Sequence, residues 1–264
     1  MKAAEKHKYV TGDDGMFRLL FGLGREDVRE NVILISFLPV EKFGDANAKE
    51  NVFKGRLYSG INFLTKNGGY TVIKTPIGGT LAADCVLFLS KTRVKRIIYA
   101  GSCGGTGPSG IGDIIIGSKA FCGGAFSDYY HPGKGIDNIL TSGHLFEASP
   151  RLIEKILSIN DGMPEGSSEL KEGSIFTIGS LSAETDDVLK KIVARGFDGI
   201  DMELAPVYHA AGILKAEAAG ILFTSDLPLE KPFWKRPGPG ENEKLKTAVA
   251  RVIKLASLAA DMII

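Results

Sequence analysis

The sequence predicts an α/β protein built on a largely buried sheet. Short runs rich in Ile and Val alternate with helical stretches along the chain, and this is the pattern of strands that are covered on both faces. The 33 glycines stand mostly between these apolar runs, so they punctuate short elements and do not form a low-complexity linker. No internal repeat and no long linker divides the 264 residues, and we expect one domain over residues 1–264.

The strands expected first along the chain are apolar segments bounded by Gly, Pro or charged residues. The segment Leu81–Leu89 between two of them has helical character. The strands are predicted at Asn31–Leu38, Tyr70–Ile77, Arg96–Ala100, Asp113–Cys122 and Ser174–Ile178.

The second half alternates in the same way. Glu184–Ala194 is acidic at its start, carries lysines near its end and is followed by Gly196, which is the charge order and stop signal of a helix. The segments that follow are a short strand ending near Asp201, a helix over Leu204–Ala216, a strand over Gly220–Thr224, a Pro-rich surface loop over Leu227–Glu243, and a closing helix whose apolar face runs from Leu245 to Ala256.

Charge and cysteine content exclude several classes of protein. Thirty-two Lys and Arg balance 31 Asp and Glu, and this near-neutral charge argues against a dedicated nucleic-acid binder. Three cysteines without metal-ligand spacing indicate neither a disulfide framework nor a zinc site. The charged N-terminus lacks the apolar core of a signal peptide, and no apolar run is long enough to cross a membrane. We therefore expect a soluble, cytoplasmic protein.

Two glycine-bearing segments are candidate ligand-binding turns. Gly78-Gly79-Thr80 and Gly101–Gly105 each follow a predicted strand, and glycines allow backbone N–H groups to approach an anion. Neither segment has the spacing of a dinucleotide fingerprint or a Walker loop. Either could be an ordinary tight turn, but two turns at strand ends favour a ligand crevice.

Carboxylates stand at two further strand ends. Glu203 precedes an apolar helix, where it could cap the helix or accept hydrogen bonds from a sugar diol. Asp226 ends the Gly220–Thr224 strand with Ser225, and it could be a turn-former or face a crevice. The four histidines show no metal-ligand spacing, and Cys103 has no recognisable activating partner. The convergence of these two carboxylates with the glycine segments at one sheet edge is the main sign of a site.

Three segments in order resemble the nucleoside phosphorylase and nucleosidase superfamily. They are Tyr99–Gly105 with the following Gly112–Gly117, then Gly199–Ala205, and then Phe223–Asp226, and the similarity extends over roughly Val32 to Pro228. The resemblance implies a single domain with a mixed, partly barrel-like central sheet flanked by helices. It also implies phosphorolytic cleavage of the N-glycosidic bond of nucleosides, purines favoured, to free base and ribose 1-phosphate.

The resemblance also implies roles for individual residues. Asp226 would be the general acid at purine N7, a group typically worth about 10²–10⁴-fold in rate. The other implied roles are phosphate binding by Gly101, Ser102 and Gly104, ribose binding by Met202 and Glu203, and base binding by Ser225, Asp226 and Leu181, the last in place of a stacking aromatic residue. The partners implied are a nucleoside, phosphate as co-substrate and further copies of the chain in a dimer, trimer or hexamer. No metal and no organic cofactor is implied.

The sequence departs from the phosphorylase pattern at two positions. Tyr99 stands where an arginine usually precedes the serine of the glycine segment, and Ser36–Glu41 replaces a Gly-Asp-Pro motif with its arginine. A buried phosphate dianion needs paired positive charge. Lys231, Lys235 and Arg236 in the Pro-rich loop, or a neighbouring subunit, could supply it. Hydrolytic members, including those acting on adenosine monophosphate, also lack the first arginine and share features with Ser127-Asp128-Tyr129. Hydrolysis and a catalytically inactive binding protein are therefore the alternatives.

Overall fold

Part of the central sheet closes into a ring of strands, and the rest continues from this ring as an open sheet. The computed structural model describes residues 14–131, 135–163 and 170–262. Its ten-stranded sheet follows the order β10 (Glu217–Asp226), β6 (Ile114–Gly123), β8 (Leu170–Ile178), β9 (Gly199–Asp201), β5 (Arg96–Gly105), β1 (Asn31–Ile35), β4 (Tyr70–Lys74), β3 (Ser59–Phe63), β2 (Lys49–Lys54). The remaining strand, β7 (Leu145–Glu147), lies outside this order and pairs with β6. Because β10 also pairs with β5, the first five strands of this order form a closed ring. The predicted mixed, partly closed α/β sheet is confirmed.

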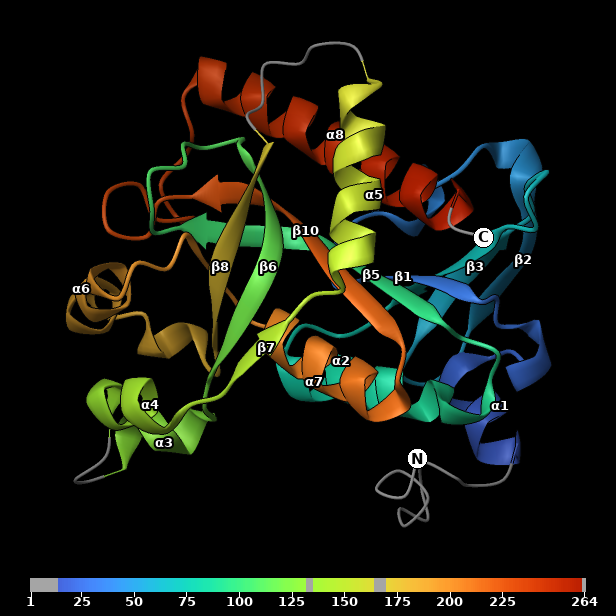
Figure 1. Ribbon diagram of the computed structural model, residues 1–264, viewed down its shortest axis with the longest axis horizontal. Coiled ribbons are helices and arrows are strands. Elements are labelled where there is room, and N and C mark those ends of the chain that lie inside the picture. The colour runs from blue at the N-terminus through green and yellow to red at the C-terminus, as the bar shows by residue number, and fades with distance from the viewer. Residues whose placement is uncertain (1–13, 132–134, 164–169, 263–264) are drawn as a thin grey trace.

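Helices cover both faces of the sheet (Figure 1). The long C-terminal helix α8 (Pro239–Met262) packs with α5 (Pro150–Asp161) over β10. On the other face α7 (Leu204–Leu214) packs against α2 (Gly79–Phe88). The remaining helices are α1 (Asp14–Phe21), α3 (Phe126–Tyr130), α4 (Ile136–Ser142) and α6 (Asp186–Ala194), with short 3₁₀ helices η2 (Arg25–Asp27), η3 (Val40–Lys42), η4 (Ala46–Ala48), η5 (Leu89–Lys91) and η6 (Leu181–Ala183). None of the described helices has the length and apolar character that a membrane span needs.

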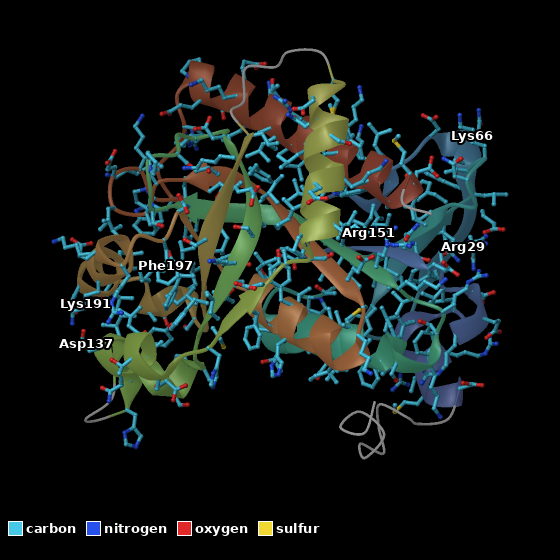
Figure 2. The ribbon with its side chains drawn as sticks, viewed as in Figure 1. Arg29, Lys66, Asp137, Arg151, Lys191 and Phe197 are labelled. Atoms are coloured by element: carbon cyan, nitrogen blue, oxygen red, sulfur yellow. The ribbon has the colours of Figure 1, made fainter. Side chains whose placement is uncertain are left out.

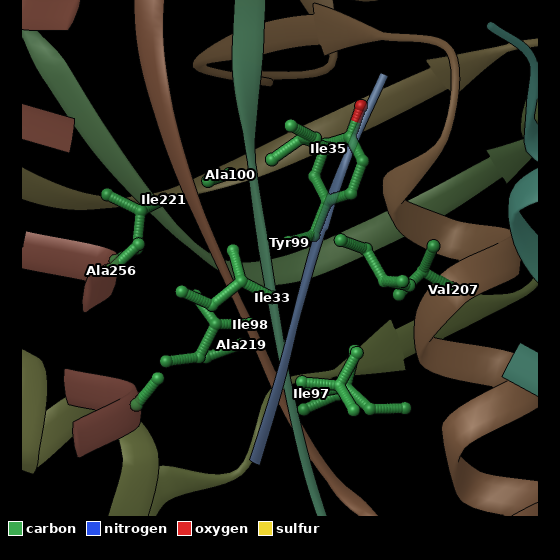
Figure 3. Close-up of a cluster of buried hydrophobic side chains, with 14 of the residues drawn as sticks. Ile33, Ile35, Ile97, Ile98, Tyr99, Ala100, Val207, Ala219, Ile221 and Ala256 are labelled. Carbon is green, nitrogen blue, oxygen red and sulfur yellow. The ribbon is translucent and has the colours of Figure 1, made fainter. Parts of the chain in front are cut away.

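The strands form where the sequence concentrates β-branched residues. Ile33 and Ile98 are almost fully buried and pair in register between the parallel strands β1 and β5. Figure 3 shows these side chains with Ala219 and Ile221 of β10 and with Ala256 of α8 in one apolar layer. Fully burying such a side chain contributes about 1.5–3 kcal/mol, so this layer fixes the relative positions of β1, β5 and β10. The carboxyl ends of β5 and β10 are thereby held side by side.

A second, smaller core supports the rim beside β8. Phe197 packs on Phe176 of β8 and on Phe121 of β6. At the surface, the Lys191 ammonium of α6 lies 2.9 Å from the Asp137 carboxylate of α4, and Figure 2 shows the pair at this end of the molecule. The η6 segment is therefore held in place by side-chain packing and is not a free loop.

Several boundaries and elements differ from the sequence-based expectations. The hairpin β2–β3, the strand β7 and the helices α1, α3, α4 and α5 were not expected from the sequence. The helix predicted from Glu184 begins at Asp186, because the Thr185 hydroxyl caps it by accepting the Val188 N–H. The loop predicted to end at Glu243 ends earlier, because Pro239 starts α8, and Pro suits the first turn of a helix.

The predicted turn at Gly101–Gly105 is wrong, because β5 continues to Gly105 and pairs with β10 and β9. Its glycines serve close packing. A Cβ atom at Gly104 would lie 2.6 Å from Cγ of Pro228, and one at Gly105 would lie 2.9 Å from a methyl carbon of Leu227. The other predicted turn is present at Gly78, which adopts a φ of 117° before α2.

Candidate active site

A cleft of about 290 Å³ opens at the carboxyl ends of β5, β9 and β10. It brings together the predicted site residues Ser102, Gly104, Leu181, Met202, Glu203, Ser225 and Asp226. Gly101 is not among the residues that line it, and a Cβ atom at that position would meet the Tyr99 ring instead. The position matches the rule that open α/β sheets bind ligands at the carboxyl ends of their strands.

Asp201 and Glu203 have different tasks, although only one residue separates them. The Asp201 carboxylate accepts the backbone N–H groups of Glu203 (3.0 Å) and Leu204 (2.7 Å), so Asp201 caps α7. It also accepts the Thr177 hydroxyl at 2.6 Å. Burial, and then the nearby Glu203 charge, raise the pKa of Asp201 to about 7. The capping role that the sequence offered to Glu203 is therefore taken by Asp201.

Glu203 is left to face the cleft. One carboxylate oxygen accepts the Gly78 N–H at 2.7 Å and the other accepts the Tyr99 hydroxyl at 2.9 Å. Only 5% of the residue is exposed, and this burial raises the pKa of Glu203 while both hydrogen bonds oppose the rise. An ionised carboxylate has about four lone-pair sites, and those that the protein does not occupy remain for a ligand. A carboxylate held this way can receive the two hydroxyls of a cis-diol.

Tyr99 stands where the resemblance implies an arginine, and in the structure it has a different function. The residue is 1% exposed, and Figure 3 shows its ring among the buried apolar side chains of the sheet, with the hydroxyl at one end. Burial, and next the Glu203 charge, raise the pKa of Tyr99 well above its usual value, so the hydroxyl remains a donor. Tyr99 orients Glu203 and supplies no positive charge for an anion.

Asp226 is the last residue of β10 and is 7% exposed. Its carboxylate accepts the Ser225 hydroxyl at 2.7 Å. Burial raises the pKa of Asp226, whereas the Ser225 hydroxyl and the Phe233 N–H lower it, and the net direction is upward. A raised pKa increases the protonated fraction near neutral pH, which is what a proton donor requires. The environment therefore fits an acid better than a simple turn-former.

The other sequence candidates fit structural roles. Cys103 lines the cleft, but burial raises the pKa of its thiol, so it is no activated nucleophile. His209 is exposed on α7, where its ring stacks on Phe146. No group of three or more His, Cys, Asp or Glu within the described residues is arranged to hold a metal ion.

The structure adds lining residues that sequence reasoning missed. Glu184 lines the cleft next to Leu181, although the sequence placed it at the start of a helix. Phe37, Ile77 and Phe233 form an apolar mouth and are 44%, 62% and 56% exposed. These residues lie in connections whose paths depend on tertiary packing, so no local sequence signal identified them.

Among the residues that the structure describes, the cleft is lined by no Lys, Arg or His side chain. Two of the three loop cations have partners elsewhere, since Lys231 pairs with Glu241 and the Lys235 ammonium lies 3.3 Å from the Glu230 carbonyl oxygen. The carboxylates Glu184, Asp201, Glu203 and Asp226 thus dominate the electrostatics of the cleft within one chain.

Comparison with known sequences identifies the family. The sequence profile described as the Phosphorylase superfamily matches residues 26–264. The chain belongs to this superfamily. A DeoD-type purine nucleoside phosphorylase of Buchnera aphidicola is 31% identical over 139 residues, which cover 52% of this chain and 54% of that protein. A second such phosphorylase, from Vibrio cholerae, is 28% identical over 165 residues, covering 61% and 65%. The matches thus span less than two thirds of the length of these curated relatives.

Solved structures of the superfamily share the fold. A purine nucleoside phosphorylase of Toxoplasma gondii superposes with a TM-score of 0.72 at 21% identity, over 90% of this chain and 92% of that one. A uridine phosphorylase of Vibrio fischeri gives 0.67 at 19% identity, over 89% and 92%. An AMP nucleosidase of Bacteroides thetaiotaomicron gives 0.65 at 19%, over 94% and 97%. The resemblance to nucleoside phosphorylases and nucleosidases is confirmed, and at these identities the structural likeness concerns the fold alone.

Proposed function

We propose that this chain cleaves the N-glycosidic bond of purine nucleosides and that phosphate is the acceptor. The observation that carries the cleavage chemistry is that Glu203 and Asp226, from different elements, line one cleft. Glu203 would hold the ribose 2′ and 3′ hydroxyls, and Met202 would contact the sugar. Asp226 would protonate purine N7 as the bond breaks, because a purine anion is a poor leaving group. The named similarity to purine nucleoside phosphorylases supports phosphate as acceptor.

Hydrolysis is the second candidate, and the composition of the cleft favours it. A buried phosphate dianion without paired positive charge is strongly disfavoured, and no cationic side chain of the described residues lines the cleft. The Gly101–Gly105 segment belongs to a strand paired on both sides, so few of its N–H groups are free for an anion. Phosphorolysis therefore requires positive charge from the 227–238 loop or from a second copy of the chain.

Product analysis separates the two acceptors. We expect adenosine, inosine or guanosine to give free base and ribose 1-phosphate, with turnover that depends on added phosphate. Free ribose formed at a rate independent of phosphate would show that the reaction is hydrolysis and not phosphorolysis. Binding of nucleosides without any turnover would contradict both and leave a binding protein. Uridine in the same panel tests the purine preference.

The 227–238 loop gives a separate prediction about phosphate. Phe233 of this loop reaches the cleft, so movement of the loop would bring Lys235 and Arg236 nearer to it. Neutralising both should raise KM for phosphate, or for a 5′-phosphorylated substrate, by about two- to thirtyfold, since exposed charge pairs are worth about 0.2–1 kcal/mol each. Lys66→Gln is the control, because Lys66 is exposed on the open extension of the sheet (Figure 2). Unchanged KM values for both ligands would show that the segment is an ordinary surface loop.

A further inference from the structure

The two places where the sequence departs from the phosphorylase pattern meet in the structure. Ser36 directly follows β1 and Tyr99 lies in β5, and these strands are parallel neighbours in which Leu34 pairs with Tyr99. The Ser36 and Tyr99 hydroxyl oxygens lie 3.3 Å apart, although 63 positions separate the two residues in the chain. Both residues are buried. The two departures therefore belong to one hydrogen-bonded unit.

The unit is a chain of hydroxyl groups that ends at Glu203. The Tyr99 hydroxyl donates its single proton to the Glu203 carboxylate at 2.9 Å. The Ser36 hydroxyl therefore has to supply the proton of its own contact with Tyr99. Behind Ser36, the Thr75 hydroxyl oxygen lies 3.4 Å from the Ser36 oxygen and 3.4 Å from the Ile35 carbonyl oxygen. The chain thus leads from the end of β1 to the one carboxylate that it serves.

Glu203 is fixed by this chain on one side and by the backbone on the other. One carboxylate oxygen accepts the Gly78 N–H at 2.7 Å, and the other accepts the Tyr99 hydroxyl. Because each oxygen has its own donor, the two contacts fix the rotation of the carboxylate as well as its position. Without the Tyr99 hydroxyl, the carboxylate could turn about its contact with Gly78.

We propose that Tyr99 and Ser36 are positioning residues that act together on Glu203 and set the selectivity of the site for ribose over 2′-deoxyribose. This inference rests on the proposed function, in which Glu203 receives the ribose diol. A cis-diol gains fully only when both carboxylate oxygens face its two hydroxyls. A 2′-deoxyribose presents one of these hydroxyls, so it tolerates a rotated carboxylate better. Loss of positioning should therefore cost the ribonucleoside more.

The kinetic test is the ratio of kcat/KM for adenosine to that for 2′-deoxyadenosine. Tyr99→Phe keeps the buried ring and removes the hydroxyl, so the ratio should fall by about tenfold, the order expected for one hydrogen bond to a charged group. Ser36→Ala should lower the ratio by about two- to threefold, because Ser36 acts mainly through Tyr99. Since the two hydroxyls share one network, Ser36→Ala should cost less in the Tyr99→Phe background than in the wild type.

Tyr58→Phe is the matched control. Tyr58 is 1% exposed, as Tyr99 is, and its hydroxyl donates to the Leu81 carbonyl oxygen at 3.1 Å, but it does not line the cleft. This variant should lose thermal stability and keep the wild-type ratio. Equal losses on the two nucleosides in Tyr99→Phe, or a full Ser36→Ala effect in that background, would overturn the inference and leave glycosidic cleavage standing.

The hydroxyl chain also acts on the charge of Glu203. Burial raises the pKa of Glu203, and hydrogen bonds from the Gly78 N–H, Tyr99 and Ser36 oppose the rise. Removing the Tyr99 hydroxyl should therefore move this pKa further upward. The other titratable residues of the cleft within the described chain are Cys103, Glu184, Asp201 and Asp226. None of them is a cation that could replace the lost donor.

Titration of the free protein gives a readout that needs no turnover. In carboxyl-¹³C NMR of glutamate-labelled protein, the Glu203 resonance is assigned by its loss in Glu203→Gln. Its titration midpoint should be higher in Tyr99→Phe than in the wild type or in Tyr58→Phe, and an unchanged midpoint would overturn the inference. A wild type that cleaves neither nucleoside would overturn the proposed function and the ribose selectivity with it. A raised midpoint would then support only the contact between Tyr99 and Glu203.

Discussion

Asp226→Asn should lower turnover of adenosine- or inosine-like substrates by about 10²-fold or more. Asparagine keeps the shape of the side chain and can still accept from Ser225 at the end of β10, so the fold and much of the ground-state binding should survive. It cannot give a proton to N7, however, and the base would leave as an anion. The measurement is kcat for natural nucleosides, read as a loss of transition-state stabilisation.

Two comparisons isolate the proton transfer. A riboside with a nitrophenol leaving group needs little protonation, so Asp226→Asn should spare most of its turnover. Asp161→Asn, at the exposed end of α5, is a matched control for an Asp-to-Asn change and should leave kcat unaltered. Because burial raises the pKa of Asp226, wild-type activity on natural nucleosides should decline as pH rises through that pKa. Near-normal activity of Asp226→Asn on natural substrates would reject the general-acid role and leave Asp226 only a structural role in the turn.

Glu203→Gln should weaken transition-state binding of ribosides by about 1–3 kcal/mol, the cost of an unmatched charged hydrogen bond. The variant keeps one acceptor oxygen, so it can satisfy either the Gly78 N–H or the Tyr99 hydroxyl, but not both as the carboxylate does. Its amide also presents a donor toward the ribose hydroxyls. The measurement is kcat/KM for a ribonucleoside and for its 2′-deoxy counterpart.

The deoxy substrate distinguishes diol binding from a general disturbance of the cleft. A 2′-deoxynucleoside lacks one of the two hydroxyls, so the substitution should affect it much less than the ribonucleoside. Equal losses on both substrates would reject Glu203 as the diol-binding group. Thermal unfolding of the variant, compared with the wild type, checks that the Gly78–Glu203–Tyr99 contacts have not been lost with the fold.

The sequence predicted the buried strands because their residue types strongly favour a strand that is covered on both faces. The segments Asn31–Leu38, Arg96–Ala100 and Gly220–Thr224 are rich in apolar and β-branched residues, and each contains or lies within a central strand. The β2–β3 hairpin was missed because β2 is exposed at nearly every position, so it carries no apolar pattern. The Gly101–Gly105 error has a related cause, since glycine signals a turn by itself and close packing only when its neighbours are known.

In the candidate site, too, the sequence could identify some residues and not others. Glu203 and Asp226 could be selected from the sequence because they follow predicted strands that share one sheet edge. Their partners could not be selected, since the contacts of Glu203 with Gly78 and Tyr99 join residues 125 and 104 positions apart in the chain. Lys231 and Lys235 remain loop cations with partners of their own, and their contribution to an acceptor site stays a prediction.

By itself the sequence determined the α/β class, the central strands and the two carboxylates, because burial patterns and strand ends are local properties of the chain. Only the tertiary structure decided that Asp201 caps α7 and leaves Glu203 to the cleft. It also decided that the Tyr99 hydroxyl donates to Glu203, and that Glu184 lines the same cleft as Asp226. The physical reason is that hydrogen-bond partners and desolvation depend on which distant segments close around a group, and that closure is set by packing of the whole sheet.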